Sequence, residues 1–139
     1  MRGIDLIYTS FIISILSGCA VHITTTEPKV DTETGLMWEG YNDMRLNWSD
    51  ANLYCKNLSL EEGSDWRLPK IKELQTLIDI KKYDPAAKDG FNVTSNRYWS
   101  STSNISYSDK AWYIYFETGG TFSTDKYDEH YILCVRGRQ

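Results

Sequence analysis

The chain has 139 residues, enough for one domain of ordinary size and too few for two. Its 41% hydrophobic and 24% charged residues exclude wholesale disorder, and its net charge of −4 disfavours nucleic acid and other polyanions as partners. Two histidines and three cysteines leave few ways to build a soft metal site, so composition favours a small binding domain over a metalloenzyme or a DNA-binding protein.

The first 18 residues are predicted to be a signal peptide. The stretch from Ile4 to Gly18 is apolar, but it is too short and too often interrupted by polar residues to span a bilayer. Its end, Leu16-Ser17-Gly18-Cys19, is similar to a bacterial lipobox, which predicts lipidation of Cys19 and stable anchoring through several acyl chains. The alternative is an ordinary secretory signal with a cysteine near its cleavage site.

Residues 19–29 are predicted to form a tether between the anchor and the domain. This segment holds a run of three threonines and Pro28 but shows no apolar periodicity. We expect residues 30–139 to form the folded domain.

The first half of the domain predicts one short strand and two helices. A turn-forming cluster over 31–35 precedes an apolar strand over 36–38. Asn47 is a good N-cap for a helix in which Trp48, Ala51 and Cys55 share one face. Pro69 marks the start of a second helix, whose apolar stripe comprises Ile71, Leu74, Leu77 and Ile78.

The second half predicts a loop followed by strands. Residues 81–96 are polar and carry a proline and a glycine, which favours a loop with little regular structure. Strands are expected over 98–102, 111–116, 121–124 and 131–136, with Gly119-Gly120 turning the second strand into the third. In the second strand, Trp112, Ile114 and Phe116 are expected on one face and Tyr113 and Tyr115 on the other.

Several short motifs occur in a fixed order along the domain. They are Thr34-Gly35-Leu36-Met37-Trp38, Trp48-x-x-Ala51-x-x-x-Cys55, Asp65-Trp66-Arg67-Leu68-Pro69-x-x-x-Glu73-Leu74, Tyr98-Trp99-Ser100-Ser101-Thr102, Ala111-Trp112 and Cys134-Val135-Arg136. In this order they resemble the Legionella collagen-like protein C-terminal domain family over nearly all of residues 31–138. The resemblance implies an α+β, C-type-lectin-like fold, with two helices packed on a small, twisted, mixed or antiparallel sheet. It also implies a secreted adhesive or ligand-binding module, although fold alone does not fix function.

Two cysteines remain if Cys19 is lipidated, and in an oxidising compartment such a pair is most often a disulfide. The resemblance implies the same bond, because in C-type lectins the helix cysteine pairs with one on the last strand. We therefore expect a Cys55–Cys134 disulfide. A redox or catalytic thiol is the alternative, since His130 would share a strand face with Cys134, but an exposed edge histidine is the simpler expectation for His130.

No metal, cofactor or catalytic site is predicted. Calcium-binding lectins use a Pro flanked by two side-chain oxygen ligands, whereas Glu27-Pro28 is followed here by Lys29. The best acidic cluster, Asp125, Asp128 and Glu129, fits a solvated hairpin end better than a calcium site, which needs six to eight oxygens. The sequence contains no Gly-x-Ser-x-Gly, phosphate loop or His-Glu-x-x-His, which argues against an enzyme.

Ligand-binding residues cannot be assigned from the sequence, although two loops are the best candidates. Trp66, Arg67 and Trp99 suggest a sugar-stacking surface, but they fit core and loop-anchoring roles better, with Arg67 paired to an acid. The loops over 81–96 and 104–110 are better placed for binding, because binding residues concentrate on loops above a rigid scaffold.

Taken together, these features predict a non-catalytic, calcium-independent ligand-binding or adhesion module of the bacterial cell envelope. A lipid anchor would hold it to a membrane, and Ala20 after the cysteine favours the outer membrane. Its ligand would be a glycan or a protein. The alternative is a structural envelope protein that docks on a partner protein and has no soluble ligand.

Overall fold

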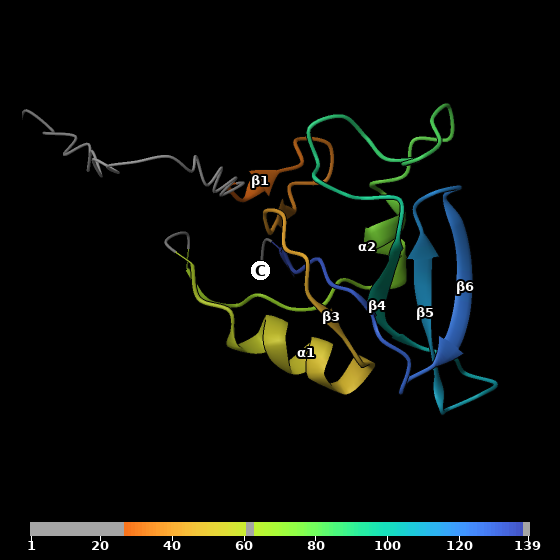
Figure 1. The fold of residues 1–139 in the computed structure, drawn as a ribbon. Coiled ribbons are helices and arrows are strands. Elements are labelled where there is room, and N and C mark those ends of the chain that lie inside the picture. Colours follow the sequence, from red (N-terminus) through yellow and green to blue (C-terminus); the bar gives the residue numbers. More distant parts are fainter. Residues whose placement is uncertain (1–26, 61–62, 138–139) are drawn as a thin grey trace, which may run out of the picture.

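The computed structural model describes residues 27–60 and 63–137, which hold two helices and eight strands (Figure 1). In chain order the elements are β1 (Lys29–Val30), β2 (Met37–Trp38), β3 (Arg45–Leu46), α1 (Trp48–Asn57), α2 (Ile71–Gln75), β4 (Arg97–Ser103), β5 (Lys110–Tyr115), β6 (Gly120–Asp125), β7 (His130–Tyr131) and β8 (Val135–Arg136). The predicted signal peptide, Cys19 and most of the tether lie outside the described residues. Lys29, the last residue of the predicted tether, lies in β1.

The strands form two sheets. A three-stranded antiparallel sheet has the order β1-β2-β8, and a five-stranded mixed sheet has the order β3-β7-β4-β5-β6. Within the larger sheet, β4, β5 and β6 form an antiparallel meander, and β7 pairs parallel with β4 and antiparallel with β3. The predicted α+β class is confirmed, whereas the lectin-like relationship stays a prediction.

Helix α1 forms as its sequence predicts. The side chain of Asn47 accepts a hydrogen bond from the Asp50 backbone N–H, which satisfies one of the free donors at the helix start. Ala51 and Cys55 are fully buried, and the indole of Trp48 on the same face donates to the Ser100 carbonyl at 2.8 Å. The apolar face therefore docks the helix on the larger sheet.

Helix α2 is shorter than its apolar stripe predicts, because it ends at Gln75. The Thr76 hydroxyl donates to the Glu73 carbonyl, and the N–H of Leu77 bonds to Leu74 three residues back rather than four. Such local side-chain bonds compete with the helical pattern. Leu77 is still fully buried after the helix has ended. The backbone of Ile78, the next residue, forms an isolated antiparallel β-bridge with Ala87 in the long loop.

The helix N-terminus of α2 is held by one acidic residue. Both Arg67 guanidinium nitrogens Nη1 and Nη2 donate to Glu73 at 2.7 Å, and the Lys70 backbone N–H donates to the same carboxylate. The Arg67 guanidinium keeps the pKa of Glu73 below its ordinary value. The expected pairing of Arg67 with an acid is thus confirmed, and it orders the turn before α2.

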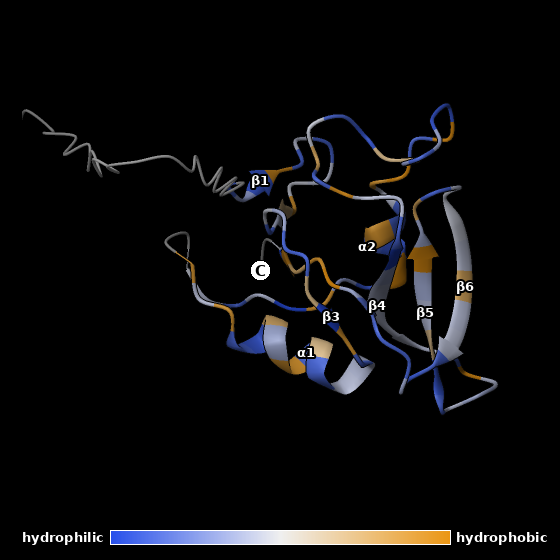
Figure 2. Ribbon diagram, viewed as in Figure 1, coloured by the Kyte–Doolittle hydropathy of each residue, from blue (hydrophilic) through white to orange (hydrophobic). Residues whose placement is uncertain are grey.

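Both faces of the larger sheet are covered by hydrophobic side chains. Neighbouring residues in β4 enter opposite clusters, Tyr98 beside α2 and Trp99 beside α1, and β5 repeats the alternation with Ile114 and Tyr113. Figure 2 shows hydrophobic residues on α2 and near the C-terminal end of β5. The predicted division of residues 111–116 into two faces is confirmed for Ile114 and Phe116 against Tyr113 and Tyr115.

The predicted strand over 131–136 is wrong as one element, because the structure divides it between the two sheets. Residues 130–131 form β7 and residues 135–136 form β8. Between them, the Ile132 carbonyl accepts from the Asn42 side chain, and the Cys134 backbone bonds to Glu39. The backbone between β7 and β8 therefore pairs with the loop after β2 instead of continuing either ladder.

The prediction that His130 lies exposed at a sheet edge is also wrong. Strand β7 lies between β3 and β4, and His130 is 6% exposed. Its ring centroid lies 4.3 Å from that of Trp99 and 4.8 Å from that of Tyr113. An internal strand position buries a side chain that an edge would leave in water.

The predicted disulfide between Cys55 of α1 and Cys134 is present, with the Cα atoms 5.4 Å apart. Both cysteines are fully buried in the cluster beside α1. Among the described residues, no helix is long and apolar enough to cross a membrane.

We predict that replacing Cys55 and Cys134 together by alanine lowers the free energy of unfolding by about 4–5 kcal/mol, because the bond closes a loop across 79 residues. Urea unfolding of the oxidised chain and of the double variant measures this difference. Adding a reductant should lower the midpoint of the wild-type chain to that of the variant and leave the variant unchanged. An unchanged wild-type midpoint would contradict the stabilising role of the bond.

Candidate functional site

A cavity of about 230 Å³ opens between the three-stranded sheet and the long loop before β4. We call it the Trp38 pocket. Its walls come from β1, from β2 and the residues after it, from the loop, and from the segment between β7 and β8: Glu27, Lys29, Trp38, Glu39, Gly40, Gly90, Phe91, Asn92 and Leu133. The loop part lies within residues 81–96, one of the two loops predicted to carry binding residues.

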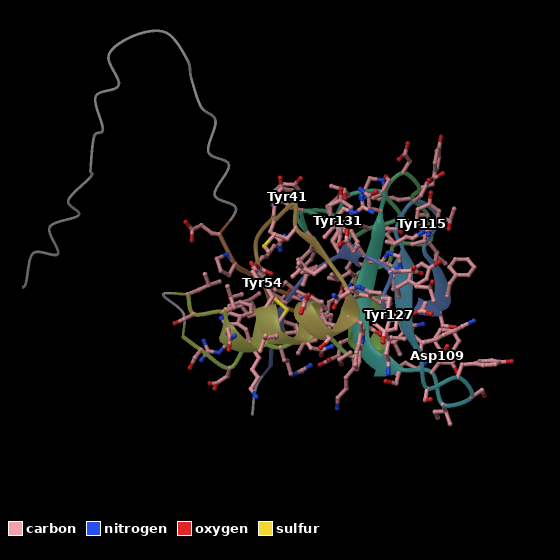
Figure 3. All side chains as sticks on the ribbon, turned by 60° about the horizontal axis from the view of Figure 1, so that its bottom comes forward. Tyr41, Tyr54, Asp109, Tyr115, Tyr127 and Tyr131 are labelled. Atoms are coloured by element: carbon pink, nitrogen blue, oxygen red, sulfur yellow. A yellow bond between two sulfur atoms is a disulfide. The ribbon has the colours of Figure 1, made fainter. Side chains whose placement is uncertain are left out.

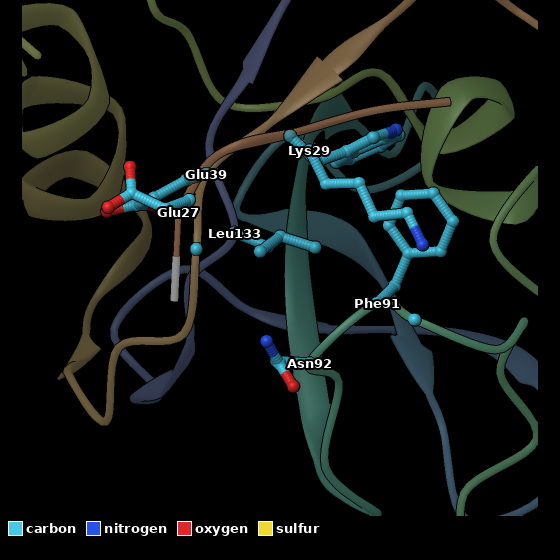
Figure 4. Close-up of a pocket in the computed structure, with 9 residues that line it drawn as sticks. Glu27, Lys29, Glu39, Phe91, Asn92 and Leu133 are labelled. Atoms are coloured by element: carbon cyan, nitrogen blue, oxygen red, sulfur yellow. The ribbon is translucent and has the colours of Figure 1, made fainter. Parts of the chain in front are cut away.

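One wall of the Trp38 pocket combines an aromatic ring with a cation. The Lys29 ammonium lies 4.5 Å from the centroid of the Phe91 ring and 3.4 Å from the Asp89 carbonyl (Figure 4). Gly90, between these residues, has a φ of 81°, and a side chain there would collide with the Lys29 ammonium. Strand β1 and the loop are thereby brought together at the rim.

Trp38 contributes a buried hydrogen-bond donor that has no partner. Its side chain is 1% exposed, and its Nε1 forms no hydrogen bond within the described chain. The indoles of Trp48, Trp66 and Trp99, by contrast, each donate to a backbone carbonyl at 2.8 to 3.0 Å. Because buried donors are nearly always satisfied, the Trp38 N–H points to an acceptor that residues 27–60 and 63–137 do not supply.

Glu39 is a half-buried carboxyl group in the same pocket. The Tyr54 hydroxyl donates to its Oε1 at 2.8 Å, and the Cys134 backbone N–H donates to its Oε2 at 3.1 Å. Burial raises the pKa of Glu39 above its ordinary value, against the lowering effect of these hydrogen bonds. Burial, followed by the charge of Glu39, also raises the pKa of Tyr54. Glu39 therefore ties β2 to α1 and to the C-terminal segment, and it is also one of the residues that line the cavity.

The residues singled out from the sequence for sugar stacking do not form a surface. Trp66 and Trp99 are 2% and 0% exposed, and their indole N–H groups bond to Gly63 and Leu46. They are core residues, as expected. Neither of the two cysteines of the domain is a free thiol, because each is bonded to the other, so the redox alternative with His130 lacks its nucleophile.

The acidic cluster after β6 is not brought together around one point. Asp125 accepts from the Tyr127 backbone N–H, and Asp128 accepts from the Thr124 hydroxyl. Glu129 instead lines a second cavity, separate from the Trp38 pocket, together with Arg45 and Arg97. Across residues 27–60 and 63–137, no three His, Cys, Asp or Glu side chains gather as a metal site requires. The absence of a metal from this protein stays a prediction, and Cys19 lies outside the described residues.

Sequence reasoning missed most of the Trp38 pocket. The predicted loop over residues 81–96 includes Phe91 and Asn92, which line the pocket, but Trp38 had only the signal of a buried strand residue. Glu39 and Lys29 carried no signal at all, because their roles come from partners more than 50 residues away, Cys134 and Phe91.

These features define a small, disulfide-bonded α+β domain with an aromatic-lined cavity and no assembled catalytic group in the part that the structure describes. A family model, the Lcl C-terminal domain, matches residues 29–136, and the chain belongs to this family. The match begins at the first residue of β1 and ends at the last residue of β8. No curated protein matches the chain. The family is one of unknown function, and no catalytic family is indicated.

We predict that the stability of the wild-type chain relative to Glu39→Gln falls as the pH rises above about 4.5, the ordinary pKa of the group. The native carboxyl keeps its proton over a range in which the unfolded one has lost it, so raising the pH through that range favours unfolding. The difference levels off once the native carboxyl is ionised. Urea unfolding of both proteins from pH 4 upward measures this difference in stability. Other carboxyl groups, such as that of Glu73, contribute equally to both proteins and so do not affect the difference. A relative stability that rose with pH would contradict the burial effect.

Proposed function

We propose that this chain is a non-catalytic module of the bacterial cell envelope that is anchored by lipid at Cys19 and binds a ligand in the Trp38 pocket. The proposal rests on a concave cavity lined by Trp38 and Phe91, together with the buried Nε1 of Trp38, which has no hydrogen-bond partner within the described residues. A ligand oxygen that accepted this hydrogen bond would satisfy the donor. The cavity is close to the lower end of the size range of small-molecule sites.

The rest of the pocket fits a neutral, hydroxyl-rich ligand such as a sugar residue. Phe91 offers an apolar ring face, Asn92 offers both amide donors and an acceptor, and Glu39 offers carboxyl oxygens. The Lys29 ammonium and the carboxylates of Glu27 and Glu39 give the walls both signs of charge, so the pocket does not select a strongly charged ligand (Figure 4). All of these contacts come from protein groups, and the proposed binding needs no calcium.

The alternative function, docking on a partner protein, is favoured by a different surface. The loop between β4 and β5 exposes Ile105 and Tyr107, and the turn between β6 and β7 exposes Tyr127. Hydrogen bonds from Lys126 to the carbonyls of Ser108 and Asp109 hold the two connections together. An exposed apolar patch of this kind suits a protein partner, although it is small.

We predict that Asn92→Ala and Phe91→Ala each weaken binding of a glycan by about tenfold, because each removes a contact worth about 1–2 kcal/mol in the pocket. A glycan array probed with the wild-type chain selects the glycan, and titration of the variants with it gives the affinities. Binding should persist in EDTA.

The matched control is Tyr127→Ala, which removes an aromatic ring that is 88% exposed and lies away from the pocket. Unchanged glycan binding by this variant supports the proposal. Absence of any glycan ligand, together with loss of attachment to an envelope protein in Tyr127→Ala, would favour the docking alternative. Thermal melting of each variant separates loss of binding from loss of folding.

The lipid anchor is tested by Cys19→Ser. We predict that the variant loses acylation and remains an unprocessed precursor or a soluble protein, because serine offers no thiol to receive the diacylglycerol. Metabolic labelling with palmitate and fractionation of the membranes measure both effects, with Cys55→Ala/Cys134→Ala as a control that keeps Cys19. Persistent label in Cys19→Ser would contradict the anchor.

A further inference from the structure

A second cavity, of about 290 Å³, lies at one end of the five-stranded sheet. We call it the arginine pocket. Its charged and aromatic walls come from four adjacent strands, with Arg45 on β3, His130 and Tyr131 on β7, Arg97 on β4 and Tyr115 on β5, and Ser95, Asn96 and Glu129 complete it. Figure 3 shows Tyr131 and Tyr115 at this end of the sheet and Asp109 toward the other end. It shares no lining residue with the Trp38 pocket.

The two arginines are exposed, and each lies over an aromatic ring. The guanidinium carbon of Arg45 lies 5.9 Å from the centroid of Tyr131, and that of Arg97 lies 5.7 Å from the centroids of both Tyr113 and Tyr115. Within the described chain neither guanidinium has an acidic partner at ion-pair distance. A guanidinium that lies over a ring keeps the N–H donors in its own plane available, so two such groups in one cavity offer an oriented set of donors for an anion.

His130 lines the same cavity and carries a buried nitrogen without a partner. Its Nδ1 lies 2.8 Å from the Glu129 carbonyl oxygen, to which it donates, and its Nε2 has no partner within residues 27–60 and 63–137. In the neutral ring Nε2 is therefore an acceptor, and it becomes a donor for a carboxylate only when the ring takes up a proton from solvent. Burial is the main reason that the pKa of His130 lies below its ordinary value. The charged groups that act on the ring are Arg97 on β4 and Arg45 on β3, which lower this pKa, and Asp128 in the preceding turn, which raises it.

We propose that the arginine pocket binds a small carboxylate, which Arg45 and Arg97 hold by hydrogen bonds beside His130. The planar N–H fork of a guanidinium matches the two oxygens of a carboxylate. The carboxylate of Glu129 in the wall repels a dianion more strongly than a monoanion, which disfavours phosphate and sulfate. This site goes beyond the proposed function, because it is a separate cavity with a different ligand chemistry.

The test compares propionate with its neutral isostere propionamide, titrated into the isotope-labelled full chain and followed by NMR. Propionate should cause saturable shifts at the amides of residues 95–97 and 129–131, and propionamide should not. Arg45→Gln and Arg97→Gln should each weaken propionate binding by about tenfold or more, because each removes charged hydrogen-bond donors. Glu129→Gln should strengthen it, because the substitution removes a like charge from the wall.

Lys110→Gln is the matched control. The Lys110 ammonium also lies over a tyrosine ring, 5.2 Å from the centroid of Tyr107, but it lies at the other end of β5. Its removal changes the net charge as the arginine variants do and should leave propionate binding unchanged. The imidazole signals give a second readout: bound propionate offsets the two arginines and should raise the pKa of His130, whereas the pKa of His22, the other histidine in the chain, should stay the same.

Several results would overturn the proposal. They are equal binding of propionamide, tighter binding of sulfate than of propionate, unchanged affinity in both arginine variants, or a weakening by Lys110→Gln as large as theirs. If the arginine variants do not fold, Glu129→Gln decides, because its side chain is exposed and a carboxylate site requires tighter binding in this variant. If Glu129→Gln binds propionate with unchanged or weaker affinity, the proposed site is refuted.

Discussion

The C-terminal segment over residues 130–136 joins all the layers of this domain. Its first two residues pair with β3 and β4 of the larger sheet, and its last two pair with β2 of the smaller one. Along the segment, Ile132 and Cys134 enter the hydrophobic cluster beside α1, whereas Leu133 and Val135 enter the cluster beside α2. The disulfide at Cys134 then fixes the same segment to α1. Neither core cluster is complete until this late part of the chain is in place.

Both cavities depend on the same segment. Leu133 lines the Trp38 pocket, and His130 and Tyr131 line the arginine pocket. Each cavity also includes a residue whose buried nitrogen has no partner in the described chain, Trp38 or His130. Buried polar atoms without partners cost stability, and proteins keep them mainly where another group completes the hydrogen bond. A segment held by two sheets and a disulfide provides the rigid backbone on which such sites keep their geometry.

Local elements were predictable because their signals lie within a few residues. The Asn47 cap, the buried face of α1 and the turn at Gly119-Gly120 between β5 and β6 all follow from turn chemistry and periodicity. The second helix was overestimated because the Thr76 hydroxyl ends it while the apolar stripe continues. For the candidate site, the sequence identified the loop that carries Phe91 but gave no reason to include Trp38 or Glu39, whose environment is assembled from distant segments.

The amino-acid sequence by itself determined the α+β class, the helix start at Asn47, the family resemblance and, with that resemblance, the disulfide partner of Cys55. Tertiary structure decided the division of the last strand between two sheets, the burial of His130 and the formation of both cavities. The physical reason is the distance along the chain between the interacting groups. Glu39 meets Cys134 across 95 residues, and Arg45 lies over the ring of Tyr131, so neither contact leaves a periodic trace in the sequence.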